Sequence, residues 1–184
     1  MRKLVVSLFT FVAVCIVAAD ASAQRRQPHT GSHAVGVDVG AFVPDDDRFD
    51  SGLLAEGFYE YYLTPRVSVR GAFGTTDPEL EREDDDSLRQ RRLRMGLLYN
   101  WERGQWHPFV GAGFGAYFLR SKDNGRPIGQ GRTEPGVDVG AGIEQFLSPT
   151  LALKGEGRYY WIGTPPGGPD PSGWALTLGL KHYF

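Results

Sequence analysis

Hydrophobic and polar residues alternate along most of this chain with a period of two, as they do in β-strands with one apolar and one polar face. Near the end of the chain, for example, Trp174, Leu176 and Leu178 fall on one face, while Thr177 and Lys181 fall on the other. No stretch of comparable length has the 3.6-residue period of a helix. The alternating segments predict eight strands, over residues 33–43, 53–63, 66–75, 88–101, 106–119, 134–147, 150–162 and 173–184.

The connections between these strands alternate in length. Thr64–Pro65, Glu102–Gln105 and Ser148–Pro149 are short. The longer connections are the polar stretches Pro44–Gly52, Thr76–Ser87, Arg120–Thr133 and Gly163–Ser172. Barrels of the outer membrane have short turns on the periplasmic side and longer loops outside. The chain is therefore expected to be all-β, an eight-stranded antiparallel up-and-down transmembrane β-barrel with both ends on the short-turn side.

Residues 1–23 have the features of a secretory signal peptide. Arg2 and Lys3 precede an apolar run, and Ala21–Ala23 provides the small-x-small pattern of a cleavage site. We expect this segment to be cleaved from the mature chain. The only cysteine, Cys15, lies inside it, so disulfides are not expected to stabilise the mature protein.

The remaining chain suits a single domain. We expect residues 24–32 to form a short periplasmic tail and residues 33–184 to form the barrel. The mean hydropathy of −0.32 would in most chains indicate a soluble protein. A membrane barrel is an exception, because every second residue of its strands faces a polar interior and lowers the average. Export followed by barrel formation predicts a location in the bacterial outer membrane.

The tryptophans indicate which face of the strands points inward. A soluble barrel of the lipocalin type would hide its apolar face and expose the charged one. All four tryptophans lie on the apolar face at strand ends, two near short turns and two near long loops: Trp101, Trp106, Trp161 and Trp174. Aromatic girdles at the two membrane interfaces have this placement. The residues from Leu151 to Trp161 span roughly 25 Å at the usual rise and tilt, the height of an outer-membrane apolar band.

The polar face carries six acids and seven bases. They are Asp38, Glu56, Glu60, Arg66, Arg70, Arg92, Arg94, Asp138, Glu144, Lys154, Glu156, Arg158 and Lys181. A solvated outer face is one explanation of such charges. The other is an interior network of ion pairs, since an eight-stranded barrel has just enough lumen for side chains to fill. Because glycines such as Gly111, Gly113 and Gly115 leave room for long partners, we predict the interior network.

Two glycine-rich segments and the last residue carry a resemblance to a known family. His107–Gly115, Val139–Glu144 and the terminal aromatic Phe184 resemble the small outer-membrane β-barrel superfamily that includes OmpA-type, OmpX-type and OmpW-type barrels. The resemblance covers nearly the whole mature chain. Its motifs specify the architecture better than they specify an activity.

The resemblance also implies how the barrel is assembled. In this superfamily the last strand is read by the barrel-insertion machinery, through a terminal aromatic preceded by apolar residues at alternate positions. Leu176, Leu178, Leu180 and Phe184 match this assembly signal, whereas His182 stands where an aromatic is usual. The implied partners are outer-membrane lipid and lipopolysaccharide, with the insertion machinery and periplasmic chaperones during assembly.

The chain has few candidates for catalysis or metal binding. It contains no Gly-x-Ser-x-Gly motif and no His-x-Ser pair on a strand, so a serine nucleophile with a nearby base is not visible. His33 and His182 are expected near each other once the barrel closes, but two histidines without a fixed spacing are a weak metal signal. We predict no enzyme, no cofactor and no metal site. The net charge of −2 does not point to nucleic acid.

The predicted long loops differ in charge. Asp45–Asp47 and Asp50 crowd the first, residues 77–86 in the second carry seven acids and one base, and Arg120, Lys122, Arg126 and Arg132 oppose Asp123 in the third. We interpret these charges as solvated loop tips. The alternative is a divalent cation bound at the lipopolysaccharide surface, because hard cations prefer carboxylate oxygens.

Two functions from different classes follow from the charged interior. The first is a structural or surface-interaction role, with a lumen plugged by charged side chains that would crowd so narrow a barrel. The alternative is a narrow channel or transporter for ions or a small solute, opened by rearrangement of ion pairs. A lipid-modifying outer-membrane enzyme is a distant third.

Overall fold

The computed structural model describes residues 28–46, 50–76, 87–101, 106–123, 126–127, 131–164 and 170–184. Its strands are β1 (His33–Pro44), β2 (Gly52–Tyr62), β3 (Val67–Thr76), β4 (Ser87–Asn100), β5 (Trp106–Asp123), β6 (Arg126–Pro127), β7 (Arg132–Phe146), β8 (Leu151–Ile162) and β9 (Gly173–Tyr183). Strand β6 has only two residues and pairs with the end of β5. The other eight are the predicted strands, with ends that mostly differ by one or two residues. Within the described ranges, no helix is long and apolar enough to cross a membrane.

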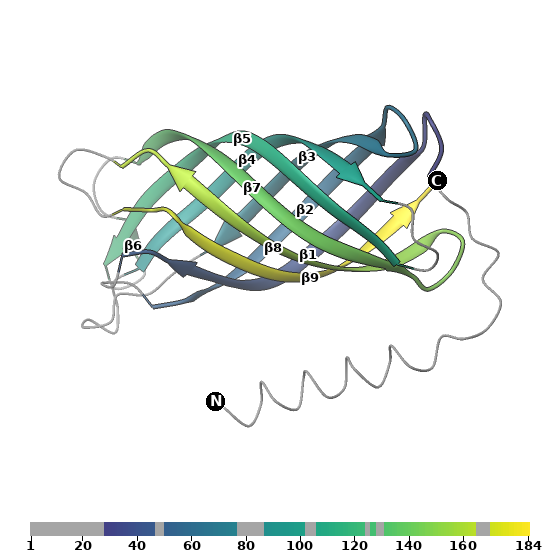
Figure 1. Cartoon of the computed structure of the whole chain (residues 1–184). Helices are drawn as coiled ribbons and strands as arrows, with labels where there is room; N and C mark the ends of the chain where they lie inside the picture. The colour runs from purple at the N-terminus through teal and green to yellow at the C-terminus, as the bar shows by residue number, and fades with distance from the viewer. Residues whose placement is uncertain are drawn as a thin grey trace, which may run out of the picture.

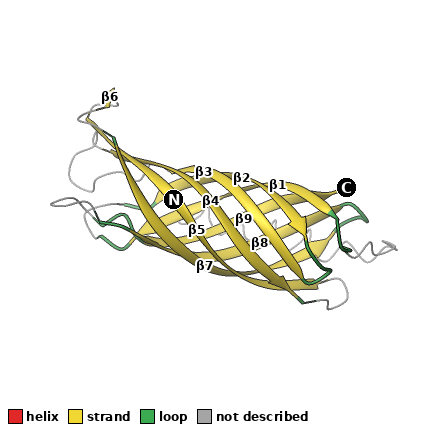
Figure 2. Cartoon of the chain, turned by 90° about the horizontal axis from the view of Figure 1, so that it is seen from above, coloured by secondary structure: helices red, strands yellow, loops and turns green. Residues whose placement is uncertain are grey.

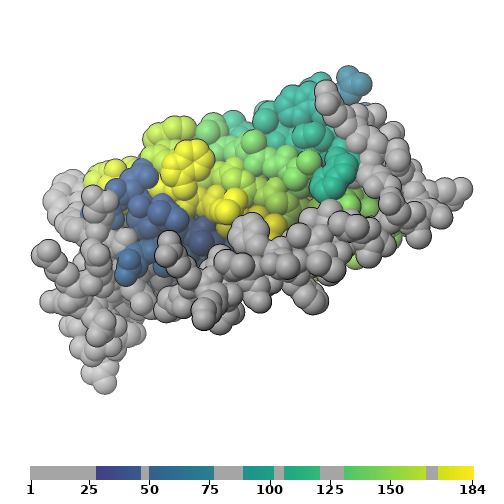
Figure 3. Space-filling view, turned by 60° about the horizontal axis from the view of Figure 1, so that its bottom comes forward, coloured from purple at the N-terminus to yellow at the C-terminus, as the bar shows by residue number. Residues whose placement is uncertain are grey.

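The strands form one closed antiparallel wall. Apart from the short β6, strands that are neighbours in sequence pair with each other; β5 pairs with both β4 and β7, and the first strand pairs with the last. Figures 1 and 2 show the strands running obliquely around the barrel. In the space-filling view, β1 in purple lies beside β9 in yellow, where the wall closes (Figure 3). The predicted eight-stranded up-and-down barrel is therefore confirmed.

Both ends of the barrel domain lie at the short-turn end. The amide nitrogen of Phe184 donates to the carbonyl oxygen of His33 at 3.0 Å, and the amide of Gly31 donates to the carbonyl of Tyr62 at 2.8 Å. The amide of Tyr183 likewise donates to the carbonyl of Thr150, in the turn before β8, at 2.7 Å. The chain therefore enters and leaves the barrel beside its short turns, as the alternation of connection lengths predicts.

Hydroxyl side chains close two of the short turns. Thr64 Oγ1 accepts a hydrogen bond from the amide of Val67 at 2.9 Å, and Ser148 Oγ accepts one from the amide of Leu151 at 3.1 Å. In both turns a proline directly follows the hydroxyl residue: Pro65 follows Thr64, and Pro149 follows Ser148. Serine and threonine favour turns because their side chains replace a backbone acceptor.

The two faces of each strand have opposite environments. Exposed and buried residues alternate without exception along β2 and β9. In β9 the outward Leu176 is 64% exposed, whereas the inward Lys181 is 0% exposed. The apolar side chains thus form the outer surface and the charged ones fill the centre, which is the reverse of a water-soluble barrel and the pattern of a transmembrane one.

Candidate functional site

The structure places twelve of the thirteen predicted lumen charges inside the barrel, where all are buried. The lumen position predicted for Arg66 is corrected. This residue belongs to the turn before β3, which begins at Val67, and its side chain is exposed beyond the end of the wall. Removing one base from seven leaves six, which balances the six buried acids.

Near the short turns, Glu60 from β2 is held by three neighbours. Its Oε1 accepts a hydrogen bond from Ser68 Oγ at 2.6 Å, and its Oε2 lies 2.9 Å from Arg70 Nη2 and 3.0 Å from Lys181 Nζ. Lys181 also lies 2.9 Å from Glu144 Oε1 on β7. Tyrosine hydroxyls complete this group, since Tyr183 donates to Glu144 Oε2 at 2.6 Å. Every charge in this part of the lumen therefore has an opposite partner.

Glu156 from β8 is the centre of the network. Its carboxylate lies 2.9 Å from Arg70 Nη1, 2.8 Å from Lys154 Nζ and 2.5 Å from Arg158 Nη2. Lys154 in turn lies 2.6 Å from Asp38 Oδ2 on β1. One acid thus connects three bases, and Arg70 links this group to the one near the short turns.

The network continues toward the long loops through Asp138 of β7. Asp138 accepts a short hydrogen bond from Arg158 Nη1 and lies 3.5 Å from Arg94 Nη1. Arg94 also pairs with Glu56, with 2.5 Å between its Nη2 and Glu56 Oε1. Eleven of the twelve buried charges are thereby connected in one chain of ion pairs that runs along the lumen.

Strand β5 contributes glycines where the other long strands contribute charges. A side chain at Gly113 would place its Cβ 3.0 Å from Asp138 Oδ2, and one at Gly115 would place its Cβ 2.8 Å from Arg94 Cβ. Both positions also face a backbone carbonyl of β4 at under 3.0 Å. The predicted role of these glycines, to leave room for long partners, is confirmed.

Aromatic clusters lie at both ends of the charge network. Toward the long loops the cluster consists of Phe42, Leu54, Tyr117, Tyr160, Ile162 and Ala175. Toward the short turns it consists of Ala34, Tyr62, Phe146, Ala152 and Tyr183. Rings also cover cations within the network, since Lys154 Nζ lies 4.4 Å from the ring centre of Phe58 and Arg70 Cζ lies 4.6 Å from it. These aromatic and hydroxyl side chains were not among the predicted lumen residues, although their inward parity could have identified them.

Arg92 is the buried base outside this chain of ion pairs. Its Nη2 donates to Gln90 Oε1 at 3.0 Å, and its guanidinium lies 4.5 Å from the ring centre of Tyr160. Its Nε and Nη1, with Thr76 Oγ1 and the Tyr117 hydroxyl, have no hydrogen-bond partner among the described residues. Because Thr76 pairs with Gln90 and Arg92 pairs with Tyr117 across the strands, these groups lie in one region of the lumen near the long loops.

The predicted girdle residues are all on the outer surface. Trp161 and Trp174 pack against Tyr159 near the long loops, with ring centres 4.5 and 5.0 Å apart, and Trp101 packs against Tyr99 near a short turn at 5.0 Å. Trp106, at the start of β5, is also exposed. The four residues of the assembly signal, Leu176, Leu178, Leu180 and Phe184, point outward as well.

The histidines at the seam of the barrel meet an aromatic ring. His33 stacks on Phe184, with ring centres 5.7 Å apart and planes 7° from parallel, and His182 lies 6.4 Å from the same ring. Across the described part of the chain, no three metal-ligating side chains form a group that could hold an ion. Of the acidic loops, Asp45 accepts from the hydroxyl of Tyr159, and residues 77–86 lie outside the described residues.

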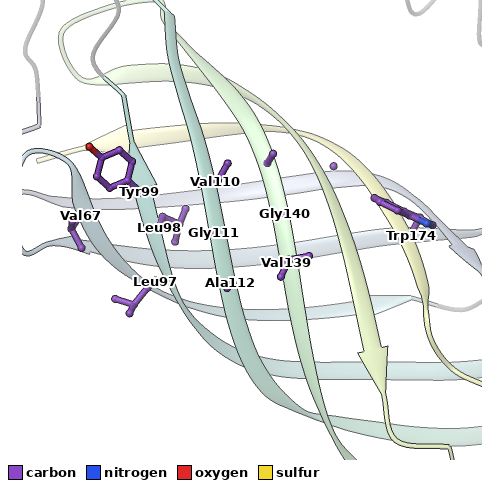
Figure 4. Close-up of a pocket in the computed structure, with 12 residues that line it drawn as sticks. Val67, Leu97, Leu98, Tyr99, Val110, Gly111, Ala112, Val139, Gly140 and Trp174 are labelled. Atoms are coloured by element: carbon purple, nitrogen blue, oxygen red, sulfur yellow. The ribbon is translucent and has the colours of Figure 1, made fainter.

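A shallow apolar hollow of about 700 Å³ lies on the outer wall. Small residues such as Ala112 and Gly140 line it together with larger side chains such as Leu97 and Trp174 (Figure 4). The hollow lies on the face that carries the exposed apolar side chains, so lipid chains are its expected neighbours.

Comparison with known proteins agrees with this architecture. The model of the outer membrane protein beta-barrel domain family matches residues 9–184. No curated protein sequence matches the chain. Among solved structures, the outer membrane protein OprG from Pseudomonas aeruginosa is 13% identical with a TM-score of 0.69, and the match covers 88% of this chain and 99% of that one.

Two further structures have the same fold. Neisserial surface protein A is 15% identical with a TM-score of 0.68, over 84% of this chain and 98% of that one. Ail, the attachment invasion locus protein of Yersinia pestis, is 15% identical with a TM-score of 0.60, over 84% of this chain and 99% of that one. At this level of identity the likeness concerns the fold alone.

Proposed function

The chain belongs to the outer membrane protein beta-barrel domain family, and from this we propose that it is a structural, surface-interacting barrel of the bacterial outer membrane with a lumen plugged by charged side chains. In this proposal the wall stabilises the protein in the membrane and the long loops provide contacts outside. A signal peptide cleaved after Ala23 and recognition of the last strand by the insertion machinery are part of the same proposal.

The observation that carries the proposal is the unbroken chain of buried ion pairs between the two aromatic clusters. A solute crossing the lumen would have to separate several of these pairs in a low-dielectric interior. Leaving a buried charge without its partner costs about 3–5 kcal/mol in proteins. A path that breaks more than one pair is therefore opposed by a high barrier.

Single-channel recording tests the plug directly. Residues 24–184 would be refolded into detergent, checked for a heat-dependent shift in gel mobility, and added to planar lipid bilayers. We expect folded protein with no discrete conductance. The matched variant K154A/E156A/R158A removes the centre of the network and is expected to conduct. Discrete conductance from folded wild-type protein would overturn the plugged lumen.

A narrow channel for ions or a small solute is the second candidate. The observation in its favour is the region around Arg92, where Nε and Nη1 lack hydrogen-bond partners among the described residues. Unpaired donors of this kind are able to solvate a passing anion. We rank it second because the ion-pair chain below Arg92 joins eleven buried charges, and its atoms without a hydrogen-bond partner are single carboxylate oxygens of Asp38 and Asp138, whose other oxygens are bound to Lys154 and Arg158. The third candidate, a lipid-modifying enzyme, has no nucleophile motif in its favour.

A further inference from the structure

Arg92 on β4 is a buried cation whose hydrogen-bond donors are only partly used. Its side chain is fully buried, and its Nη2 donates to Gln90 Oε1 at 3.0 Å. Its Nε and Nη1 have no hydrogen-bond partner within the described ranges. A buried donor without an acceptor destabilises the folded state, so native structures satisfy such groups with protein atoms, water or an ion. The surroundings of Arg92 decide which of these completes its hydrogen bonding.

The buried acids in this part of the lumen are already held by other arginines. Arg94 binds both oxygens of Glu56, with its Nη2 2.5 Å from Oε1 and its Nε 3.1 Å from Oε2. Arg158 pairs with Asp138 Oδ1. Between the centre of the network and the long loops, three buried arginines including Arg92 therefore face two buried acids, which leaves one positive charge in excess. The matching excess of one acid lies at the centre and nearer the short turns, where four acids face three bases.

Two buried hydroxyls share the region of Arg92. Tyr117 on β5 is the register partner of Arg92, and Thr76 on β3 is the register partner of Gln90. Tyr160 lies beside both Arg92 and Tyr117, 4.5 Å from the Cζ atom of one and 6.1 Å from the ring centre of the other. Among the described residues, neither Thr76 Oγ1 nor the Tyr117 hydroxyl has a hydrogen-bond partner. Since a hydroxyl rotates to donate to any nearby acceptor, these groups add two donors to those of Arg92.

The segment before β9 covers this region from the loop side. Strands β4 and β9 lie on opposite sides of the wall, with three strands between them in either direction. The carbonyl oxygen of Pro171 nevertheless accepts a hydrogen bond from Gln90 Nε2 at 3.4 Å, and both Pro171 and Ser172 are buried. Residues 170–172 therefore cross the mouth of the lumen on the loop side of Arg92. Electrostatic attraction is stronger in such a covered interior than in water.

We propose that Arg92, Thr76 and Tyr117 bind one small monovalent inorganic anion, a halide or nitrate, enclosed in the lumen beneath residues 170–172. One cation in excess balances one negative charge, whereas a divalent phosphate or sulfate would leave this region negative. Enclosure removes the hydration shell of the anion, and burying a charge is least costly for ions that are weakly hydrated.

Water is the alternative occupant beside Arg92. Water molecules would accept the free hydrogen bonds but would leave the local excess of positive charge in place. An anion provides both the acceptor and the opposite charge. The inference goes beyond the function proposed above, because the anion is a resident part of the plug and does not cross it.

Anion-dependent stability tests the proposal. Residues 24–184, refolded into lipid vesicles, would be unfolded by urea at constant ionic strength in sodium bromide and in sodium gluconate, whose anion is too large for an enclosed site. We expect about 100 mM bromide, relative to gluconate, to lower the unfolding equilibrium constant of the wild type about tenfold, as a Kd on the order of 10 mM would do. In R92M the same exchange of salts is expected to change this constant by less than about twofold. In gluconate alone, R92M is expected to unfold at nearly the same urea concentration as the wild type.

Two further variants separate the site from general effects of salt. Salts change the stability of any protein, so only the difference between variants counts. R66M removes an exposed arginine at the opposite end of the barrel and is expected to respond to bromide as the wild type does. T76V/Y117F keeps the charge of Arg92 and is expected to show a smaller response than the wild type. A gel-mobility shift on heating shows that each variant is folded. Equal responses of the wild type and R92M would overturn the proposal and assign the free donors to water.

Bromide also locates the site directly. In crystals of the refolded wild type grown with sodium bromide, an anomalous difference peak is expected beside Nε or Nη1 of Arg92. Bromide peaks confined to the outer surface would overturn the proposal. Neither experiment depends on conductance, so a negative result here leaves the plugged lumen to be judged by single-channel recording.

Discussion

Lys154 on β8 reaches Asp38 on β1 across the strand that separates them, with 2.6 Å between Nζ and Oδ2. Both residues are register partners of the same residue of β9, Gly179. Since Gly179 has no side chain, the ion pair passes directly over its Cα. A Cβ at this position would lie 1.9 Å from Asp38 Oδ1 and 2.5 Å from the carbonyl oxygen of Val37. The pair that joins β1 to the centre of the network therefore depends on a glycine in the strand between.

Gly179→Ala is expected to destabilise the barrel by about 1–3 kcal/mol, because the added methyl group overpacks the lumen and displaces Asp38. Gly57→Ala is the matched control, since a Cβ at Gly57 meets nothing within 4 Å. The measurement is urea unfolding in lipid vesicles, followed by tryptophan fluorescence. If G179A and G57A have the same midpoint, Gly179 does not position the ion pair.

Glu156→Gln is expected to cost about 3–5 kcal/mol in free energy of unfolding, because it leaves Arg70, Lys154 and Arg158 with one less buried negative charge. The same substitution at Glu134, a half-buried acid near the long loops, is expected to change stability by about 0.5 kcal/mol or less. Urea titrations of both variants in the same lipid provide the comparison. Similar decreases in the free energy of unfolding for the two variants would show that the central position of Glu156 does not stabilise the barrel more than a peripheral acid does.

Arg92 and Arg70 are both fully buried, yet they are expected to respond differently to replacement by methionine. Arg70→Met removes one cationic partner from both Glu60 and Glu156 and leaves an uncompensated buried negative charge, so it is expected to cost about 3–5 kcal/mol. Arg92→Met removes two unpaired N–H donors and is expected to cost about 1 kcal/mol or less. The measurement is the free energy of unfolding of the two variants, from urea titrations in the same lipid. An Arg92→Met variant as unstable as Arg70→Met would mean that the Arg92 donors are satisfied in the membrane-embedded protein.

Phe184→Ala is expected to reduce the folded fraction of protein in cells several-fold, because the terminal aromatic belongs to the proposed assembly signal. Phe114→Ala removes an equally exposed ring from the outer face of β5 and serves as the control. The readout is the fraction with heat-dependent gel mobility in isolated outer membranes. Equal folded fractions for the two variants would argue against a role of the last residue in assembly.

The alternation of apolar and polar residues was enough to predict the strands and the two faces of the wall. Side chains of a strand point to alternate sides, so a period of two assigns every residue to a face before any partner strand is known. Proline marked the turns predicted at Thr64–Pro65 and Ser148–Pro149 for equally local reasons. The positions of Trp101 and Trp161 at strand ends then distinguished a membrane barrel from a soluble one.

Pairing of distant strands decided the rest. Parity suggested a lumen position for Arg66, but the wall begins one residue later, and that end is set by the partner strand. Parity also could not distinguish Arg94, which reaches Glu56 and Asp138, from Arg92, which reaches neither acid.

The same limit applies to the contacts that carry the proposals. The ion pair of Lys154 with Asp38 joins β8 to β1, and that of Arg70 with Glu156 joins β3 to β8, so both depend on strands far apart in sequence. Alternation determines the side of a strand from which a residue points, because that follows from backbone geometry alone. Which residues it meets depends on hydrogen-bond register around the closed wall, and that is a property of the tertiary structure.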